Sequence, residues 1–414
     1  MRTQPARPLL TRVAFACLWI FVFSMPIEKA IEFPGFGSLS KLAGLLALGV
    51  GVVAVVFQAR FRIPGTIQIA LAIFVLWCAI TVRWSIAPDL TVDRVMTYVQ
   101  LLGLVLLLWE FCGEERYVLA IFSAYVLGTL VPAGDTLQRF LLGHQTYYNR
   151  YASSGFDPND LALTLDLSLP MSYYLTLRQK GAIRWVYYIQ MLAAAGTVFL
   201  TVSRGGTFCM LIALSLILWT LRSIPMSNRI VIAVMCAVAV VAAVTLVPAT
   251  SWKRLASAAS EVSEGTLNSR TVLWKAGLNE FQYMPFGGVG AGAYPEASAK
   301  AIGRPWAFVA VAHNSFISVM VETGLIGLGL FAGLLAMFFR AAAQMPRVTR
   351  AFWLTLLMVW IIGVCSLTWE YRKPTWLLFG LLAAHRMSLQ AKSGVTPKTT
   401  VERIPYFNTA EAYS

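Results

Sequence analysis

Long apolar segments separated by short polar ones run along most of the chain. A helix of about 17–25 mainly apolar residues is long enough to cross the hydrocarbon core of a bilayer. This length predicts about 12 membrane-spanning helices, at residues 10–25, 38–58, 65–83, 94–112, 117–133, 159–178, 184–202, 206–222, 229–248, 318–341, 350–367 and 374–388. The pattern therefore predicts an all-α polytopic membrane protein, with a helical bundle over residues 1–388 and a short polar tail over residues 389–414.

Basic residues collect in alternate loops of this arrangement, as they do in cytoplasmic loops. Only the segment "CGEER" at 112–116 departs from the alternation. The first span follows three arginines and lacks a clear small-residue cleavage site, so we expect a retained helix and not a signal peptide. An even number of spans then places both termini in the cytoplasm. The basic residues of these loops and of the tail are Arg60, Arg62, Arg178, Lys180, Arg184, Arg222, Arg229, Arg340, Arg347, Arg350, Arg386, Lys392, Lys398 and Arg403.

Two polar segments on the opposite, non-cytoplasmic side are longer than the others, at residues 134–158 and 249–312. Long loops between spans are usually functional or disordered. The second loop contains several tryptophans, tyrosines and glycines and is not of low complexity, so we expect it to fold against the bundle. These two loops predict an active-site face on the periplasmic side.

The composition excludes a water-soluble protein, because 58% of the residues are hydrophobic and 13% charged, with a mean hydropathy of +0.68. The net charge of +14 is explained by cytoplasmic loops that face anionic membrane lipids, so we expect no nucleic-acid partner. The six cysteines form no CxxC pair, and the three histidines form no HExxH motif. Neither a disulfide framework, a metal site nor a cofactor is therefore predicted.

Several basic residues fall on the periplasmic side, where the positive-inside rule disfavours them. Arg204 lies in a turn of small residues after a span, and Arg270 lies in the large loop, at the expected head of a short amphipathic helix. An arginine binds phosphate through two parallel hydrogen bonds and stays charged, so these two could hold a lipid-linked diphosphate. For the others, lipid headgroup contact and substrate binding both remain open; they are Arg150, Lys300, Arg304, Arg372 and Lys373.

His313 begins the segment "HNSFISVMVETG", directly after the large periplasmic loop. Asn314, Ser318 and Glu322 follow at helical spacing, which predicts one polar face at the start of this span. A neutral imidazole with a pKa of about 6.5 can take a proton from a hydroxyl group at neutral pH. We therefore interpret His313 as a candidate general base, with Asn314 and Glu322 as candidate substrate-binding residues.

Other polar motifs are better explained by structural roles. The run "PFGGVGAG" follows no clear strand and predicts a tight turn with close backbone packing. The cluster "DPND" at 157–160 precedes a span and predicts a helix cap. Asp166 lies deeper in that span, where we expect it to be a structural partner of an arginine.

Four segments, in this order, resemble the signature segments of the O-antigen ligase and O-antigen polymerase superfamily. They are "GFDPNDLALTLDLSLP" from 155, "SRGG" from 203, "NSRTVLWKAGLNEFQYMPFGGVGAGAYPE" from 268 and "HNSFISVMVETGLIGLGLF" from 313. The resemblance covers roughly residues 150–345. It implies a metal-independent bacterial inner-membrane glycosyltransferase whose donor is a glycan on undecaprenyl diphosphate. Arg204 and Arg270 would then hold the diphosphate, and His313 would lie at the reaction centre.

The resemblance is greatest to the ligases, which transfer O-antigen to a sugar of lipid A-core. An O-antigen polymerase, which joins lipid-linked repeat units, is the alternative within the superfamily. A lipid or glycan transporter is the alternative from another class, since about 12 spans also suit a transporter. The transporter is disfavoured because the polar residues cluster on one face and the two halves show no evident repeat.

Overall fold

The computed structural model describes residues 8–33, 37–58, 61–146, 150–220, 225–234, 237, 270–303 and 311–392. Within these residues the chain is almost entirely helical, and its strands are one short antiparallel pair, β1 (Glu32–Phe33) and β2 (Gly37–Ser38). The expected all-α architecture is therefore confirmed.

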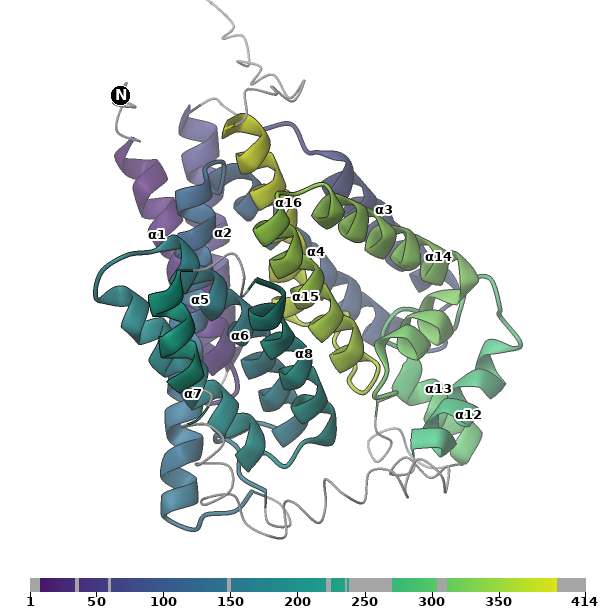
Figure 1. Ribbon diagram of the computed structural model, residues 1–414. Coiled ribbons are helices and arrows are strands. Elements are labelled where there is room, and N and C mark those ends of the chain that lie inside the picture. The colour runs from purple at the N-terminus through teal and green to yellow at the C-terminus, as the bar shows by residue number, and fades with distance from the viewer. Residues whose placement is uncertain are drawn as a thin grey trace, which may run out of the picture.

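The helices follow the apolar segments of the sequence. They are α1 (Leu9–Ser24), α2 (Leu39–Gln58), α3 (Thr66–Ile80), α4 (Pro88–Phe111), α5 (Glu115–Leu141), α6 (Pro158–Arg178), α7 (Ile183–Leu200), α8 (Arg204–Thr220), α12 (Arg270–Phe281), α13 (Tyr294–Ile302), α14 (Ser315–Ala343), α15 (Arg347–Val364) and α16 (Lys373–Lys392), with short 3₁₀ turns η1 (Met25–Ile27) and η2 (Thr81–Trp84) (Figure 1). Every expected span except the one at 229–248 coincides with one of these helices. That span lies largely outside the described residues.

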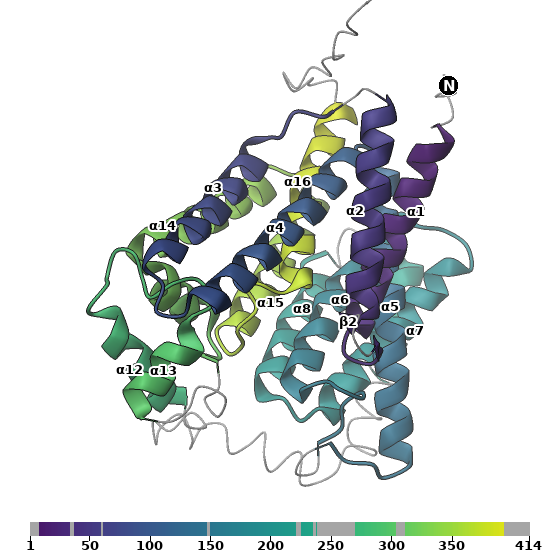
Figure 2. The ribbon, with the colours of Figure 1, turned by 180° about the vertical axis from the view of Figure 1, so that it is seen from behind.

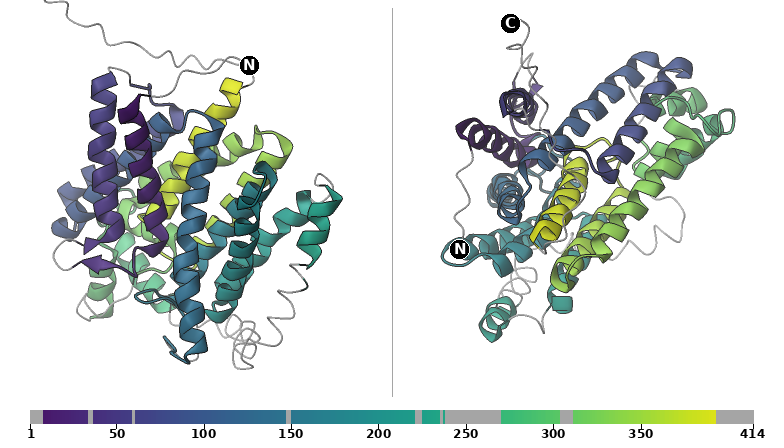
Figure 3. Two further views of the ribbon diagram at one scale, coloured as in Figure 1. Left: turned by 90° about the vertical axis from the view of Figure 1, so that its left-hand side faces the viewer. Right: turned by 90° about the horizontal axis from the view of Figure 1, so that it is seen from above.

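Eight helices in the described part of the chain are long and apolar enough to cross a membrane, namely α1–α5, α7, α14 and α15. Two further helices, α6 and α16, are more polar, and most of their side chains are buried. The reason is their position: α6 packs against α5, α7, α8 and α15, and α16 lies in the middle of the bundle (Figure 3). A helix that other helices surround does not need an apolar surface toward lipid.

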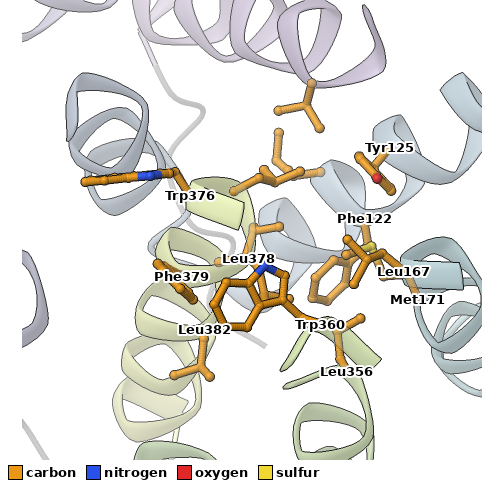
Figure 4. Packing of buried hydrophobic residues seen from close by; sticks show 14 of the residues in the cluster. Phe122, Tyr125, Leu167, Met171, Leu356, Trp360, Trp376, Leu378, Phe379 and Leu382 are labelled. Carbon is orange, nitrogen blue, oxygen red and sulfur yellow. The ribbon is translucent and has the colours of Figure 1, made fainter. Parts of the chain in front are cut away.

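Aromatic side chains of α5, α15 and α16 pack in the buried core of the bundle (Figure 4). The Trp360 ring packs on Phe379 at 5.3 Å, and its Nε1 donates to Thr375 Oγ1 at 2.9 Å. Tyr98 and Trp376 pack at 5.7 Å on the other side of α16. These contacts fix the start of α16, and with it the loop that precedes it.

Helix α14 is broken at Gly324, whose φ of 70° and ψ of −173° are not helical. The glycine-rich segment replaces the hydrogen bonds that the break removes. Leu325 N donates to the Pro285 carbonyl at 2.8 Å, and Gly290 N donates to the Glu322 carbonyl at 2.9 Å. The expected tight turn is thereby confirmed, because a Cβ on Gly290 would lie 2.2 Å from Ser85 Oγ, too close for any other residue.

Helix α5 is longer than the sequence predicted. Its residues 134–141, expected in a periplasmic loop, continue the helix, and Asp135 pairs with Arg139 one turn later at 3.1 Å. Similarly, α16 continues to Lys392 and takes in the first residues of the expected tail. We refer to the end of the bundle at which α6, α8, α14 and α16 begin as the site end; α12 and α13 also lie there (lower part of Figure 1).

Candidate active site

His313 lies in the short link before α14 and has a left-handed backbone, with φ of 48°. This conformation is unusual for a residue with a side chain and often occurs at functional sites. Asn314 fixes the link: its Oδ1 accepts from the backbone N–H groups of Phe316 at 2.9 Å and Ile317 at 3.1 Å. Its Nδ2 donates to the Cys365 carbonyl at 3.1 Å. Asn314 therefore caps α14 and ties it to the loop after α15.

Arg270 is near enough to His313 on one side and to Arg204 on the other to interact electrostatically with each. Burial lowers the pKa of His313 below its ordinary 6.5, and the Arg270 charge lowers it further, whereas Asp157 and Asp160 raise it in part. Burial likewise lowers the pKa of Arg270. The Asp157 charge raises this pKa, and the Arg204 charge lowers it. The three residues that the sequence singled out are thus brought together, and the imidazole is neutral at neutral pH.

The turn between α7 and α8 places Arg204. Val202 has a left-handed backbone with φ of 50°, and Ser203 Oγ accepts from the Gly206 N–H at 3.2 Å at the start of α8. A Cβ on Gly206 would lie 2.4 Å from Ala162 Cβ, so the glycine lets α8 begin directly against α6. Arg204 itself is half-buried.

Arg150 ties this turn to the start of α6. Its side chain is buried, and its Nε donates to the Thr201 carbonyl at 2.8 Å. Its Nη2 donates to Asn159 Oδ1 at 2.8 Å, and the same oxygen accepts from Ser203 Oγ at 2.8 Å. Arg150, expected as a substrate-binding residue, is placed to hold α6 and the turn before Arg204 together.

The acidic cluster before α6 caps that helix, as predicted. Asp157 Oδ1 accepts from the backbone N–H of Asn159 at 2.8 Å and of Asp160 at 3.4 Å. The expectation for Asp166 is wrong, because its carboxylate is fully buried and neither oxygen has a hydrogen-bond partner among the described residues. Within the described residues no arginine pairs with it.

The loop at 365–372, between α15 and α16, joins α6 to α14. Trp369 Nε1 donates to Asp160 Oδ1 at 2.8 Å, and the Trp369 backbone N–H donates to Ser315 Oγ at 2.7 Å. Arg372 lies 3.8 Å from the second oxygen of Asp160. The loop therefore holds the starts of both helices around His313 and brings Arg372, a predicted substrate-binding residue, to the edge of the site.

A buried ionic cluster lies behind these residues. Glu322, expected to bind substrate, is instead buried, and its Oε2 accepts from the Gly292 N–H at 2.7 Å. Arg94 Nη1 lies 3.6 Å from Glu322 and 3.5 Å from Glu370. Ser318 Oγ donates to Glu370 Oε1 at 3.0 Å. The cluster connects α4, α14, the glycine-rich turn and the loop before α16.

Sequence analysis missed two members of this cluster, Arg94 and Glu370. A usable signal was present for Arg94, since a charge inside an apolar span is costly and usually has a partner. Glu370 gave no such signal, because it lies in a short polar loop where a carboxylate is ordinary.

Lys300 and Lys373, which were also predicted to bind substrate, pair with carboxylates outside the candidate site. Lys300 is exposed on α13 and pairs with Glu280 at 2.8 Å. Lys373, at the start of α16, pairs with Glu28 at 2.5 Å and so ties α16 to the segment after α1. Arg304 lies outside the described residues. Within the described residues, no group of three His, Cys, Asp or Glu side chains is placed to hold a metal ion.

No curated protein matches the chain. Residues 189–332 match the family model described as O-Antigen ligase. This segment includes Arg204, Arg270 and His313, and the match confirms the resemblance seen in the sequence. Over these residues the chain is thus similar to the O-antigen ligase family, and the match supports the superfamily of O-antigen ligases and polymerases.

Proposed function

We propose that the protein is an O-antigen ligase. It transfers O-antigen polysaccharide from undecaprenyl diphosphate to a sugar hydroxyl of lipid A-core, at the periplasmic face of the bacterial inner membrane. The family domain supports a membrane glycosyltransferase with a lipid-linked polysaccharide substrate. The observation that supports the finer proposal is that Arg270 interacts electrostatically with both His313 and Arg204 at one end of the bundle.

The orientation follows from the charges of the loops. The end opposite the site end carries Arg62, Arg178, Arg184, Arg347 and Arg350 among the described residues. Such an excess of arginine favours the cytoplasmic side. The site end then faces the periplasm, with the described parts of the 249–312 loop, α12 and α13, covering it.

In the proposed reaction, an oxygen of the acceptor sugar attacks the anomeric carbon of the donor glycan. The bond between that carbon and the diphosphate oxygen breaks, and the diphosphate leaves with the electron pair. Arg204 and Arg270 stabilise the negative charge that develops on it. Each such charged donor typically contributes about 3 kcal/mol to lowering a barrier.

His313 takes the proton of the attacking hydroxyl. Its lowered pKa keeps the imidazole unprotonated at neutral pH, which a general base requires. Retaining glycosidases use a pair of carboxylates for two successive displacements. The proposed reaction needs no such pair, because it is a single displacement, which inverts the anomeric carbon. We therefore expect the product linkage to be inverted relative to the donor.

The test is complementation of a bacterial strain that lacks its O-antigen ligase, read as the lipopolysaccharide ladder on a gel. The wild-type chain should restore the ladder. His313→Ala should lower transfer by about 10²–10⁴-fold, and Arg204→Ala or Arg270→Ala by about 10²–10³-fold. His144→Ala is the control, because His144 is an exposed histidine in the loop after α5.

Membrane levels of each variant should equal wild type, so that loss of the ladder reports chemistry. A full ladder from His313→Ala would remove the proposed base. Restoration of chain length in a strain that lacks the polymerase, without any effect in the ligase-deficient strain, would assign the protein to the polymerase branch.

A further inference from the structure

A groove of about 470 Å³ lies outside the site already described, between α2 and α4, the helices nearest the viewer in Figure 2. It begins at the site end and follows α4 from Asp93 to Leu107. At 1.5 Å per residue these positions are about 21 Å apart. This exceeds the depth of one leaflet of hydrocarbon, about 15 Å, so the groove reaches from the headgroup region to the middle of the bilayer.

The end of the groove nearest the headgroups is lined by basic side chains. Lys41, Arg372 and Lys373 line it together with Glu28 and Asp93, which leaves an excess of one positive charge. Lys373 is paired with Glu28, whereas Lys41 has no ion pair among the described residues. The buried Nε of Arg372 has no hydrogen-bond partner there either. Lys41 is thus placed to bind a phosphate, together with Arg372, whose ion pair with Asp160 is long, at 3.8 Å.

The polarity of the groove changes with depth. Asp93, Thr97 and Gln100 lie on one face of α4 near the mouth, at the i, i+4 and i+7 positions. Deeper in, Leu104 and Leu107 replace them, and α2 contributes apolar side chains. A ligand that fits this sequence of surfaces has an anionic, sugar-bearing head and a hydrocarbon chain that points to the middle of the membrane.

The mouth of the groove adjoins the candidate active site through one residue. Arg372 lines the groove and also lies 3.8 Å from Asp160, whose charge acts on His313. A headgroup bound at Arg372 would place its sugars beside His313. Arg204 and Arg270 do not line the groove, so the groove and the proposed diphosphate site share neither of these arginines.

We propose that this groove binds the acceptor glycolipid, holding one acyl chain between α2 and α4 and a lipid phosphate at Lys41 and Arg372. The proposal rests on the proposed function for the identity of the acceptor. It adds where the acceptor is held and which face of the protein it enters from, namely the open side between α2 and α4.

Photolabelling of the full-length protein in nanodiscs tests binding without requiring transfer. The probe is a lipid A-core with a photoreactive group in one acyl chain, and labelled peptides are located by mass spectrometry. Labels should fall on α2 and α4. Leu45→Trp, which fills the groove, should reduce them by about tenfold, equivalent to roughly 1.4 kcal/mol. Leu46→Trp is the matched control, because Leu46 is 57% exposed, against 50% for Leu45, but does not line the groove.

Labels confined to other helices, or equal labelling of both tryptophan variants, would overturn the proposal. Loss of labelling when polyprenyl diphosphate is added would assign the groove to the donor and also overturn it. Labelling of the groove by a protein that transfers no glycan would refute the proposed function alone.

Kinetics on purified protein provide the second measurement. Leu45→Trp and Lys41→Gln should raise the KM for the acceptor by about tenfold and leave kcat and the KM for the donor unchanged. A rise in the donor KM instead would contradict acceptor binding in the groove. Leu45→Ala changes the same position but cannot fill the groove. Comparison with it separates the effect of filling the groove from a folding defect in the tryptophan variant.

Discussion

The buried cluster of one arginine and two carboxylates predicts an unusual pH dependence of stability. Arg94 lies 3.5 Å from Glu370 and 3.6 Å from Glu322, and both glutamates are almost fully buried. One guanidinium cannot neutralise two carboxylates, and burial makes the remaining negative charge costly. Burial therefore raises the pKa of Glu370 to about 7; the Glu322 charge also raises it, while Arg94 lowers it.

The direction in which stability changes with pH follows from the number of protons that the folded and unfolded states bind. A solvated glutamate ionises near pH 4.5, whereas Glu370 in the folded protein stays protonated to about pH 7. Between these values the folded state binds more protons than the unfolded state, so the stabilisation is complete below pH 4.5 and is lost as the pH rises through 7. At about 1.4 kcal/mol per pH unit, the loss across this window amounts to about 3 kcal/mol.

Glu370→Gln should remove this dependence, because glutamine is neutral at every pH and its oxygen can still accept the Ser318 hydrogen bond. Thermal unfolding of the purified protein in detergent, followed by tryptophan fluorescence between pH 5 and 8, measures it. The stability of the variant relative to wild type should rise with pH. Glu296→Gln, on α13 and outside the cluster, should keep the wild-type profile. Parallel profiles for wild type and Glu370→Gln would refute the reasoning.

Two further substitutions examine the site and its support. Asp157→Asn keeps an N-cap residue but removes a charge that raises the pKa of His313, so the acid limb of the kcat/KM profile for glycan transfer should move to lower pH; an upward shift would contradict this electrostatic assignment. Gly290→Ala should lower unfolding stability by about 1–3 kcal/mol, because its φ is 113° and its Cβ would lie 2.2 Å from a serine hydroxyl. Gly329→Ala, which meets nothing within 4 Å, should cause no loss, and equal losses for the two would show that the glycine-rich turn is not tightly packed.

The apolar pattern predicted the helices well because the bilayer imposes a minimum length on each one. The charged residues of the site were also visible in the sequence. Arg204 stands out because it lies beside two glycines on the face where the positive-inside rule disfavours basic residues, and His313 because it precedes a span. These signals come from neighbouring residues in the sequence, so they do not depend on tertiary contacts.

The supporting contacts could not be predicted because they join segments far apart in the chain. The break of α14 at Gly324 depends on the carbonyl groups of the glycine-rich turn, about 40 residues earlier. Glu322 was expected to face substrate. Because α14 is broken at Gly324 and Arg94 lies nearby, the Glu322 side chain instead points into the buried cluster. The polarity of a helix face shows that it needs polar neighbours, and only the tertiary structure shows whether these are substrate or protein.

The starts of α6, α8 and α14 lie near one another at the site end, and each helix start attracts negative charge. At α6 this charge is supplied by Asp157, whose carboxylate accepts two backbone N–H groups. At α14 the side-chain oxygen of Asn314 accepts the equivalent two. At the start of α8 the neutral Ser203 hydroxyl accepts from the Gly206 N–H, and the first residue of the helix is Arg204. Of the three helix starts, α8 is therefore the one where we expect the donor diphosphate to bind.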